Sequence, residues 1–397
     1  MNVILNDHPT IWQQLRPLTC TRTISDIRCG ILTIREKWER IYNQKASSNT
    51  QNHLSEKYDT LILDDNLIIT SHYLPDNHFI SALASLQHNS RLRSGNDVLA
   101  YRLNSELTYK LFELKELEAL TDIEYHDMPL AITNPWHIFQ HNGREIENDF
   151  HLLTQNRTSH PISNSNRVLH PENVFVEEGV QMEFTTINAT SAKVYIGKHA
   201  VVMENTSIRG SIAICEGAEI KMAAKIYGPT TIGPYSKVGG EINNSVIFGY
   251  SNKAHDGFLG NSVLGEWCNL GADTNNSNLK NDYSMVKLWS YPENRFINTG
   301  LQFCGLIMGD HSKSGINTMF NTGTSVGVSC NIFGDGFPRN YVPSFSWGGA
   351  SGFTEYNFDK AIKVAQQVML RRKLTLSNAD ITILRALFNE THKNHHH

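Results

Sequence analysis

The sequence lacks the features that would place the chain in a membrane or secreted class. No run approaches the roughly 18 apolar residues that a membrane span needs. The N-terminus, MNVILNDHP, has no basic region and no long apolar core. Charged residues make up 19% of the chain and the net charge is −4, which gives no general attraction to nucleic acid or anionic membranes. The six cysteines show no CxxC spacing, which is typical of free thiols in a reducing compartment. We therefore expect a cytoplasmic protein without nucleic-acid or membrane partners.

A repeat of six residues is the strongest pattern in the chain. Isoleucine or valine occupies eight successive positions at this spacing: Ile196, Val202, Ile208, Ile214, Ile220, Ile226, Ile232 and Val238. A period of six fits neither the 3.6-residue period of a helix nor the alternation of a strand. It fits a coil of three short flat strands, in which one β-branched side chain per strand points to the axis. The repeat predicts a left-handed parallel β-helix over residues 166–350.

The phase of the repeat breaks after Val238 and returns twice. The first run is Phe258, Leu264 and Leu270, and the second is Met308, Ser314, Phe320, Val326 and Ile332. Between them, residues 273–300 lose the repeat, and we interpret them as a functional excursion from one face. Because flat solenoid faces commonly pack as threefold oligomers, we expect a homotrimer.

The two ends of the chain lack the repeat. Residues 1–165 read as a mixed α/β domain, with helices over Ile31–Tyr42 and Asn104–Thr121 and two strands joined by a turn within Asp59–Thr70. Residues 351–397 read as two amphipathic helices, Asn357–Lys373 and Ser377–Thr391. We expect the C-terminal helices to cover the open edge of the solenoid.

Three histidines fall within the predicted solenoid and are candidate general bases, since histidine titrates near neutrality. His199 and His311 lie where solvent-exposed corners are expected, whereas His255 lies where the repeat slips, just before the excursion. Acetyl transfer to a sugar amine also needs polar groups that hold hydroxyls and phosphate. The lysines and asparagines near His255 can supply these groups, although asparagines are also common in turns.

The segment from Ile242 to Asn278 resembles the acetyltransferase core of the bifunctional enzymes that make UDP-N-acetylglucosamine. The matching text is KAHD at Lys253–Asp256, FLG at Phe258–Gly260, NLGA at Asn269–Ala272, and Asn278. The resemblance implies that His255 is the catalytic base and that Asn269 and Asn278 contact the sugar. It also implies that Gly271 and Ala272 help to hold acetyl-CoA.

Two positions depart from that family's pattern. Phe258 stands where the family has an aromatic residue with a hydroxyl, and Asn243 stands where it has a substrate-binding lysine. The sugar phosphate would then be held by one or more of the remaining lysines, which are Lys225, Lys237, Lys253 and Lys287.

The whole chain resembles a divergent branch of the same family, within the hexapeptide-repeat acyltransferases. The shared blocks are LRPLTCTRTISDIRCGILTIREKW at Leu15–Trp38, PWHIFQHN at Pro135–Asn142 and SFSWGG at Ser344–Gly349. The resemblance implies a reduced sugar-nucleotidyltransferase domain at the N-terminus. There, Arg16, Arg22 and Lys37 would hold the triphosphate, but no glycine occurs between Met1 and Cys29 to form a phosphate loop. Asp64 and Asp65, after the apolar LIL, are candidate Mg²⁺ ligands.

These observations favour an acetyl-CoA-dependent N-acetyltransferase acting on an amino-sugar phosphate, with glucosamine 1-phosphate as the preferred acceptor, in UDP-N-acetylglucosamine synthesis. The alternative is Mg²⁺-dependent sugar-1-phosphate nucleotidyl transfer from UTP or another NTP by residues 1–165, with the solenoid as a trimerisation scaffold. A zinc enzyme would need three clustered ligands, and the three solenoid histidines are spaced 56 residues apart. A non-catalytic scaffold is the remaining hypothesis, and it predicts no binding of acetyl-CoA.

Overall fold

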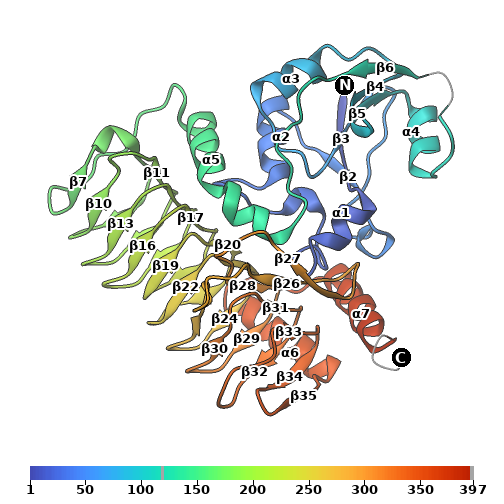
Figure 1. The fold of residues 1–397 in the computed structure, drawn as a ribbon. Helices are drawn as coiled ribbons and strands as arrows, with labels where there is room; N and C mark the ends of the chain where they lie inside the picture. Colours follow the sequence, from blue (N-terminus) through green and yellow to red (C-terminus); the bar gives the residue numbers. More distant parts are fainter. Residues whose placement is uncertain (118–119, 394–397) are drawn as a thin grey trace. The chain divides into compact units, whose positions relative to one another are not determined.

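The computed structural model describes residues 1–117 and 120–393, and it separates into two compact units (Figure 1). The α/β unit comprises Met1–Leu15, Thr21–Ile27 and Leu32–Asn134. The solenoid unit comprises Arg16–Cys20, Arg28–Ile31 and the chain from Pro135 onward. The predicted N-terminal domain extended to residue 165, whereas the long helix α5 (Pro135–Thr154) groups with the solenoid. No helix within the described residues is long and apolar enough to cross a membrane.

The α/β unit is built on a six-stranded mixed sheet. Its spatial order is β2 (Ser47–Asn49), β1 (Asn2–Asn6), β3 (Asn66–Thr70), β5 (Asp97–Leu103), β4 (Ser90–Ser94) and β6 (Thr121–Glu124). β2, β1 and β3 run parallel, whereas β5 is antiparallel to both β3 and β4. The centre of the sheet is apolar, since β1 and β3 are almost entirely buried. The mixed α/β fold predicted for this part of the chain is therefore confirmed.

The helices of this unit are α1 (Pro9–Gln14), α2 (Ile34–Tyr42), α3 (Asn77–Ala84) and α4 (Ser105–Phe112). A capping box starts α2, because the Thr33 hydroxyl accepts from the Glu36 amide at 3.1 Å and the Glu36 carboxylate accepts from the Thr33 amide at 2.7 Å. The helix predicted over Asn104–Thr121 is too long, since α4 ends where Leu114 adopts a φ of 57°. Residues 118 and 119 of that prediction lie outside the described residues.

The strand predicted at the start of Asp59–Thr70 is wrong. Only β3 forms within that range, and Leu61 and Leu63 are exposed rather than buried. The side chain of Asn66 holds this approach to β3, because it accepts from the Leu63 amide at 2.9 Å. The apolar triplet Leu61–Leu63 therefore precedes a buried strand in the sequence but forms no strand itself.

The solenoid has three faces of stacked strands, which are parallel apart from the final strand β35, coloured green at β7 through to red at β35 (Figure 1). The first face contains β8 (Val174–Val176), β11 (Val194–Ile196), β14 (Ile212–Ile214), β17 (Thr230–Ile232), β20 (Val246–Gly249), β23 (Val263–Glu266), β28 (Leu306–Met308), β31 (Thr324–Val326) and β33 (Tyr341–Val342). The second face contains β9 (Gln181–Met182), β12 (Val201–Val202), β15 (Glu219–Ile220), β18 (Lys237–Val238), β21 (Asn252–Lys253), β24 (Asn269–Leu270), β29 (Lys313–Ser314), β32 (Asn331–Ile332), β34 (Ser346–Gly349) and β35 (Gly352–Glu355). The third face contains β7 (Arg167–Leu169), β10 (Thr186–Asn188), β13 (Ser207–Arg209), β16 (Lys225–Tyr227), β19 (Glu241–Asn243) and β22 (Phe258–Gly260), and further on the pair β25 (Asn275–Asn276) and β30 (Met319–Phe320). The predicted parallel β-helix is confirmed.

The six-residue repeat fills the axis of the coil as predicted. All eight isoleucines and valines from Ile196 to Val238 are buried in one continuous apolar core. One position of the later run was wrong, because Leu259 rather than Phe258 pairs with Ile242 and points inward. The cause is a corner that is one residue short, since Leu259 and the next axial residue, Leu264, are five residues apart rather than six.

The excursion begins later than predicted, because β25 still belongs to the third face, and it carries an antiparallel hairpin, β26 (Lys287–Ser290) and β27 (Arg295–Asn298). The block PWHIFQHN begins α5, where the Asn142 carboxamide accepts from the Thr231 hydroxyl of the first face at 3.0 Å. The C-terminal helices form as predicted, as α6 (Phe358–Leu370) and α7 (Asn378–Lys393). They pack in a cluster with Val328 and Phe345, at the last coils, and the second face ends in the β34–β35 hairpin.

Candidate functional site

His255 lies on the corner that joins the second face to the third, between β21 and β22. Its side chain is exposed, as is that of the neighbouring Asp256. The same corner of the next coil carries Gly271 and Ala272, and the two corners are joined by a bond from the Asp273 amide to the Asp256 carbonyl at 3.1 Å. The structure thus brings the candidate base and the candidate acetyl-CoA residues onto adjacent coils.

The asparagines near His255 are arranged in pairs that link neighbouring coils. Asn252 donates to the Asn269 side chain at 2.8 Å across the outer side of the second face. Asn278 donates to Asn261 at 2.8 Å, but this pair lies at the other end of the third face, beyond β22. Asn269 therefore lies close in the fold to the His255 corner, whereas Asn278 lies across the third face from it.

Lys253 lies inside the coil, although the sequence predicted that it would hold a substrate phosphate. Its Nζ donates to the carbonyl oxygens of His255 at 2.6 Å, Asp256 at 2.9 Å and Gly239 at 3.5 Å. Burial lowers the pKa of Lys253 to about 8, partly offset by the carboxylates of Asp256 and Asp273. An ammonium directed at internal carbonyl groups does not face an external phosphate.

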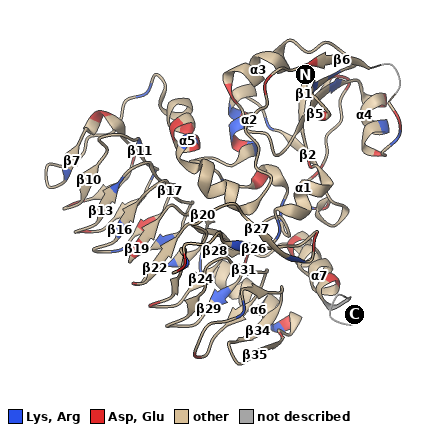
Figure 2. Ribbon diagram, in the orientation of Figure 1, with Lys and Arg blue, Asp and Glu red and all other residues tan. Residues whose placement is uncertain are grey.

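The other candidate lysines are on the surface. Lys225 lies 3.5 Å from Glu241 on the third face, and Lys237 lies 2.6 Å from Glu219 on the second face. Lys287 is exposed on β26. Figure 2 shows charges of both signs along the solenoid strands, and Lys225 and Lys237 are each paired with an acid.

His199 and His311 both lie on the corner between the first and second faces, as expected. Both have a positive φ, 56° and 60° respectively, which fits a corner residue. His199 is exposed, whereas the His311 ring stacks on Trp267 with the ring centroids 6.3 Å apart. Neither histidine shares a corner with His255.

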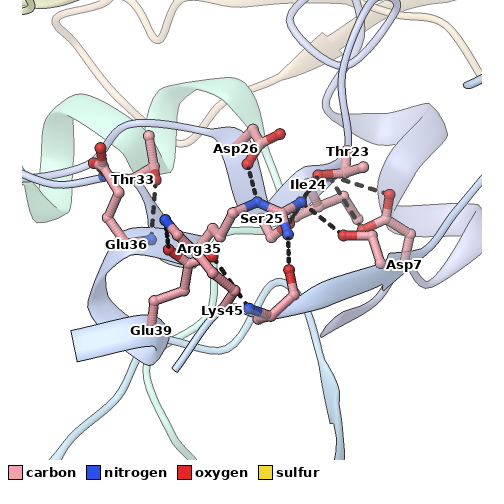
Figure 3. A network of polar contacts seen from close by, with 12 residues as sticks. Asp7, Thr23, Ile24, Ser25, Asp26, Thr33, Arg35, Glu36, Glu39 and Lys45 are labelled. Carbon is pink, nitrogen blue, oxygen red and sulfur yellow. Dashed lines mark hydrogen bonds and ion pairs between the residues drawn. The ribbon is translucent and has the colours of Figure 1, made fainter. Parts of the chain in front are cut away.

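The α/β unit presents a polar network at the carboxyl end of β1, which the sequence did not identify (Figure 3). The Asp7 carboxylate accepts from the Ile24 amide at 3.1 and 3.2 Å and from the Thr50 hydroxyl at 2.7 Å. Burial raises the pKa of Asp7 to about 7, against the lowering effect of those hydrogen bonds. Beside it, Arg35 bonds to Asp26 at 2.5 Å. In the sequence, the polar residues NDH directly after the strand residues NVIL were the feature that could have indicated this site.

The carboxyl ends of parallel strands are where open α/β sheets bind ligands. His72 follows β3 at this edge, and its ring lies edge-on to that of His8, with the centroids 6.2 Å apart. Burial, with a smaller effect of His8, lowers the pKa of His72 to about 3, so its imidazole is neutral at physiological pH. The edge therefore carries a buried acid and a neutral imidazole, and no glycine-rich phosphate loop follows β1.

The three cations expected to hold a triphosphate are all buried. Arg16 belongs to the solenoid unit, where it makes a bidentate pair with Glu390 of α7 at 2.6 and 2.9 Å and lies over the Tyr291 ring. Arg22 and Lys37 are 4% and 1% exposed within the α/β unit. Arg16 thus has a structural partner 374 residues away in sequence.

The predicted magnesium ligands do not fit that role. Asp64 and Asp65 precede β3 and therefore lie at the opposite end of that strand from His72. Asp65 makes a bidentate pair with Arg102 at 3.0 Å, and this bond lowers the pKa of Asp65. Among the described residues, no group of three or more histidine, cysteine or acidic side chains could hold a metal ion.

Comparison with known proteins supports the resemblance found in the motifs. Residues 3–158 match the family model described as sugar nucleotidyl transferase. A bifunctional sugar-1-phosphate nucleotidylyltransferase/acetyltransferase from Sulfurisphaera tokodaii is 31% identical over 152 residues, which is 33% of this chain and 37% of that protein. A bifunctional protein GlmU from Methanococcus maripaludis is 28% identical over 251 residues, or 60% of this chain and 51% of that protein.

Among solved structures, this chain is similar to LpxA, a UDP-N-acetylglucosamine acyltransferase from Bacteroides fragilis. The likeness has a TM-score of 0.27 and 14% identity, and it covers 57% of this chain and 96% of that one. The chain spans about a third to a half of the length of the curated relatives described above. The predicted resemblance to bifunctional nucleotidylyltransferase/acetyltransferase proteins is confirmed at the level of sequence.

Proposed function

We propose that the solenoid is an acetyl-CoA-dependent N-acetyltransferase that acts on an amino-sugar phosphate, glucosamine 1-phosphate in first place, for UDP-N-acetylglucosamine synthesis. The observation that carries the proposal is the exposed His255 on a corner whose neighbouring coil presents Gly271 and Ala272. Asn269 adds a polar side chain on the outer side of the second face, beside the same corner.

In this reaction the sugar amine attacks the thioester carbonyl, so that an N–C bond forms and the C–S bond breaks. The His255 imidazole takes the proton that the nitrogen loses, and coenzyme A leaves as its thiolate. Asn269 would orient the acceptor, which contributes to the rate because reacting groups must meet in a narrow geometry. Lys225 and Lys237, on the two faces that meet at this corner, are the candidates for the sugar phosphate.

The test is release of the coenzyme A thiol from acetyl-CoA and glucosamine 1-phosphate. Wild type should turn over, and His255→Ala should lower kcat by about 100-fold or more, as expected for loss of a general base. His199→Ala, an exposed corner histidine outside the site, is the matched control and should retain wild-type activity. Equal activity in wild type and His255→Ala would refute the assignment of the base.

A second proposal is sugar-1-phosphate nucleotidyl transfer by the α/β unit, supported by the family match of residues 3–158. The buried Asp7 at the carboxyl end of β1 argues against the usual phosphate loop there. Pyrophosphate release from UTP and N-acetylglucosamine 1-phosphate, with magnesium present, tests this activity. Release that persists in His255→Ala but falls in Asp7→Asn would support it, and no release from wild type would refute it.

We also propose a homotrimer. The corner that carries His255 bears exposed apolar side chains on other coils, namely Met222, Ile316 and Phe333, which suit a contact between copies. Light scattering should then give three times the 44.8 kDa mass of the chain. A monomer at micromolar concentration would contradict the proposal. We place the protein in the cytoplasm, which is supported by the six buried cysteines, since none of them forms a disulfide among the described residues.

A further inference from the structure

A charged side chain occupies an axial position of the solenoid, in register with apolar residues. Lys253 pairs with Val238 of the preceding coil, and that residue with Ile220 before it. In the next coil Leu270 continues the series. Lys253 is only 2% exposed, and lysine is almost never fully buried unless its ammonium has partners. Such a residue needs a reason beyond filling the core.

The partners of Lys253 are main-chain carbonyls of the corner that follows it. Two of them belong to His255 and Asp256, at 2.6 and 2.9 Å, and the third is Gly239 in the coil before, at 3.5 Å. An ammonium has three N–H donors and no acceptor, so three carbonyls satisfy it. Gly239 begins a short corner, in which Val238 and Ile242 are separated by three residues rather than the five found between Ile220 and Ile226.

Other corners between the second and third faces close in a different way. The Ala224 amide donates to the Lys221 carbonyl at 3.3 Å, and the Thr274 amide donates to the Gly271 carbonyl at 3.2 Å. At the His255 corner the Lys253 ammonium gathers the carbonyls from inside the coil. The corner ends at Gly257, whose φ of 115° is open only to glycine, so its path differs from that of a regular turn.

We propose that Lys253 is a positioning residue, which fixes the main chain of His255 from within the coil and thereby aims the imidazole. The catalytic part of this inference rests on the proposed acetyltransfer. The direction of a side chain follows from its main-chain position, and a displacement of about 1 Å at a reacting group can cost on the order of 100-fold in rate. The Lys253 ammonium therefore holds the main chain of the site in place, and it does not bind the sugar phosphate.

Deprotonation of Lys253 should make kcat depend on pH. Its pKa of about 8 leaves the side chain charged at neutral pH, beside the carboxylates of Asp256 and Asp273. A neutral amine has only two N–H donors and cannot serve three carbonyls at once. Wild-type kcat should therefore fall as the pH rises through about 8.

The decisive variant is Lys253→Met, because methionine suits an apolar axis and removes all three donors. We expect a folded protein whose kcat is at least 10-fold lower, with KM for acetyl-CoA and for the sugar phosphate changed less than threefold. The fall of kcat near pH 8 should be absent in this variant. Lys198→Met replaces an exposed lysine on another corner and should behave as wild type.

Crystal structures of wild type and Lys253→Met supply a readout that needs no activity. The main chain at residues 254–257 should shift by about 1 Å or more, while residues 271–274 superpose. Unchanged kcat, or an unmoved corner, would overturn the inference. If wild type acetylates no amino sugar but the corner moves in the variant, the proposed function fails and the main-chain role of Lys253 stands. Should Lys253→Met not fold, Lys253→Gln, which keeps two donors, replaces it under the same criteria.

Discussion

Asp7 makes the stability of the α/β unit depend on pH. Its carboxyl group is buried at the end of β1, and burial raises its pKa from 3.8 to about 7. The folded unit therefore binds a proton more tightly than the unfolded chain between these two values. Stability contributed by the protonated form is complete below pH 3.8 and is lost as the pH rises through about 7. Asp7→Asn, which cannot ionise, should remove this dependence.

The size of the effect follows from the two pKa values. A difference of about three units corresponds to roughly 4 kcal/mol, at 1.36 kcal/mol per unit. Because the unfolded chain is already ionised at pH 5, the change between pH 5 and pH 8 is smaller, about 3 kcal/mol. Asn at this position can still accept from the Ile24 amide, so Asp7→Asn should be more stable than wild type at pH 8 and gain less at pH 5.

The assay is urea unfolding at pH 5 and pH 8, with pulse-labelling hydrogen exchange of peptides from β1 and β3. These peptides report the α/β unit separately from the solenoid. Asp64→Asn, at an exposed carboxylate, is the matched control and should show the wild-type pH dependence. An equal difference between Asp7→Asn and wild type at the two pH values would refute the reasoning.

Three further substitutions test packing in the solenoid unit. Gly239→Ala would place a Cβ 2.4 Å from the Ala254 carbonyl oxygen, so both the unfolding temperature and kcat should fall; unchanged values for both would contradict the short-corner geometry. Arg16→Ala removes the bidentate partner of Glu390, and we expect a loss of about 2 kcal/mol with faster proteolysis of α7, whereas an unchanged cleavage rate would argue against the pair. Phe320→Ala empties a fully buried position and should cost about 3–5 kcal/mol in denaturant unfolding; a loss below 1 kcal/mol would mean that the coil collapses around it.

The axial core of the solenoid could be predicted because it follows from one local rule. Each strand of a coil places one side chain on the axis, so a spacing of six in the sequence translates directly into burial of Ile196 to Val238. The rule failed at Phe258 because the corner between Leu259 and Leu264 is one residue short. The sequence of this corner does not show the missing residue, and only the register of the strands does.

The site was predictable only in outline. His255 stood out because it falls where the repeat slips, and the fold does place it on an exposed corner. The inward position of Lys253 ran against the general exclusion of charge from cores, so the sequence favoured a surface role for it. The Arg16–Glu390 pair joins residues 374 positions apart, and no local pattern contains that information. Asp7 was not predicted, because a single acid after an apolar strand, without a glycine-rich loop beside it, does not by itself indicate a site.

The last hairpin of the solenoid, β34–β35, affects whether molecules can associate end to end. Stacked parallel coils resemble a growing fibre, since each coil offers its strand edges to a further one. Through most of the second face the strands run in one direction, but β35 runs antiparallel to β34. A second molecule that tried to extend this face would therefore meet a reversed edge and lose the register of its axial side chains. Four residues thus act as a stop for end-to-end polymerisation, without any change to the core behind them.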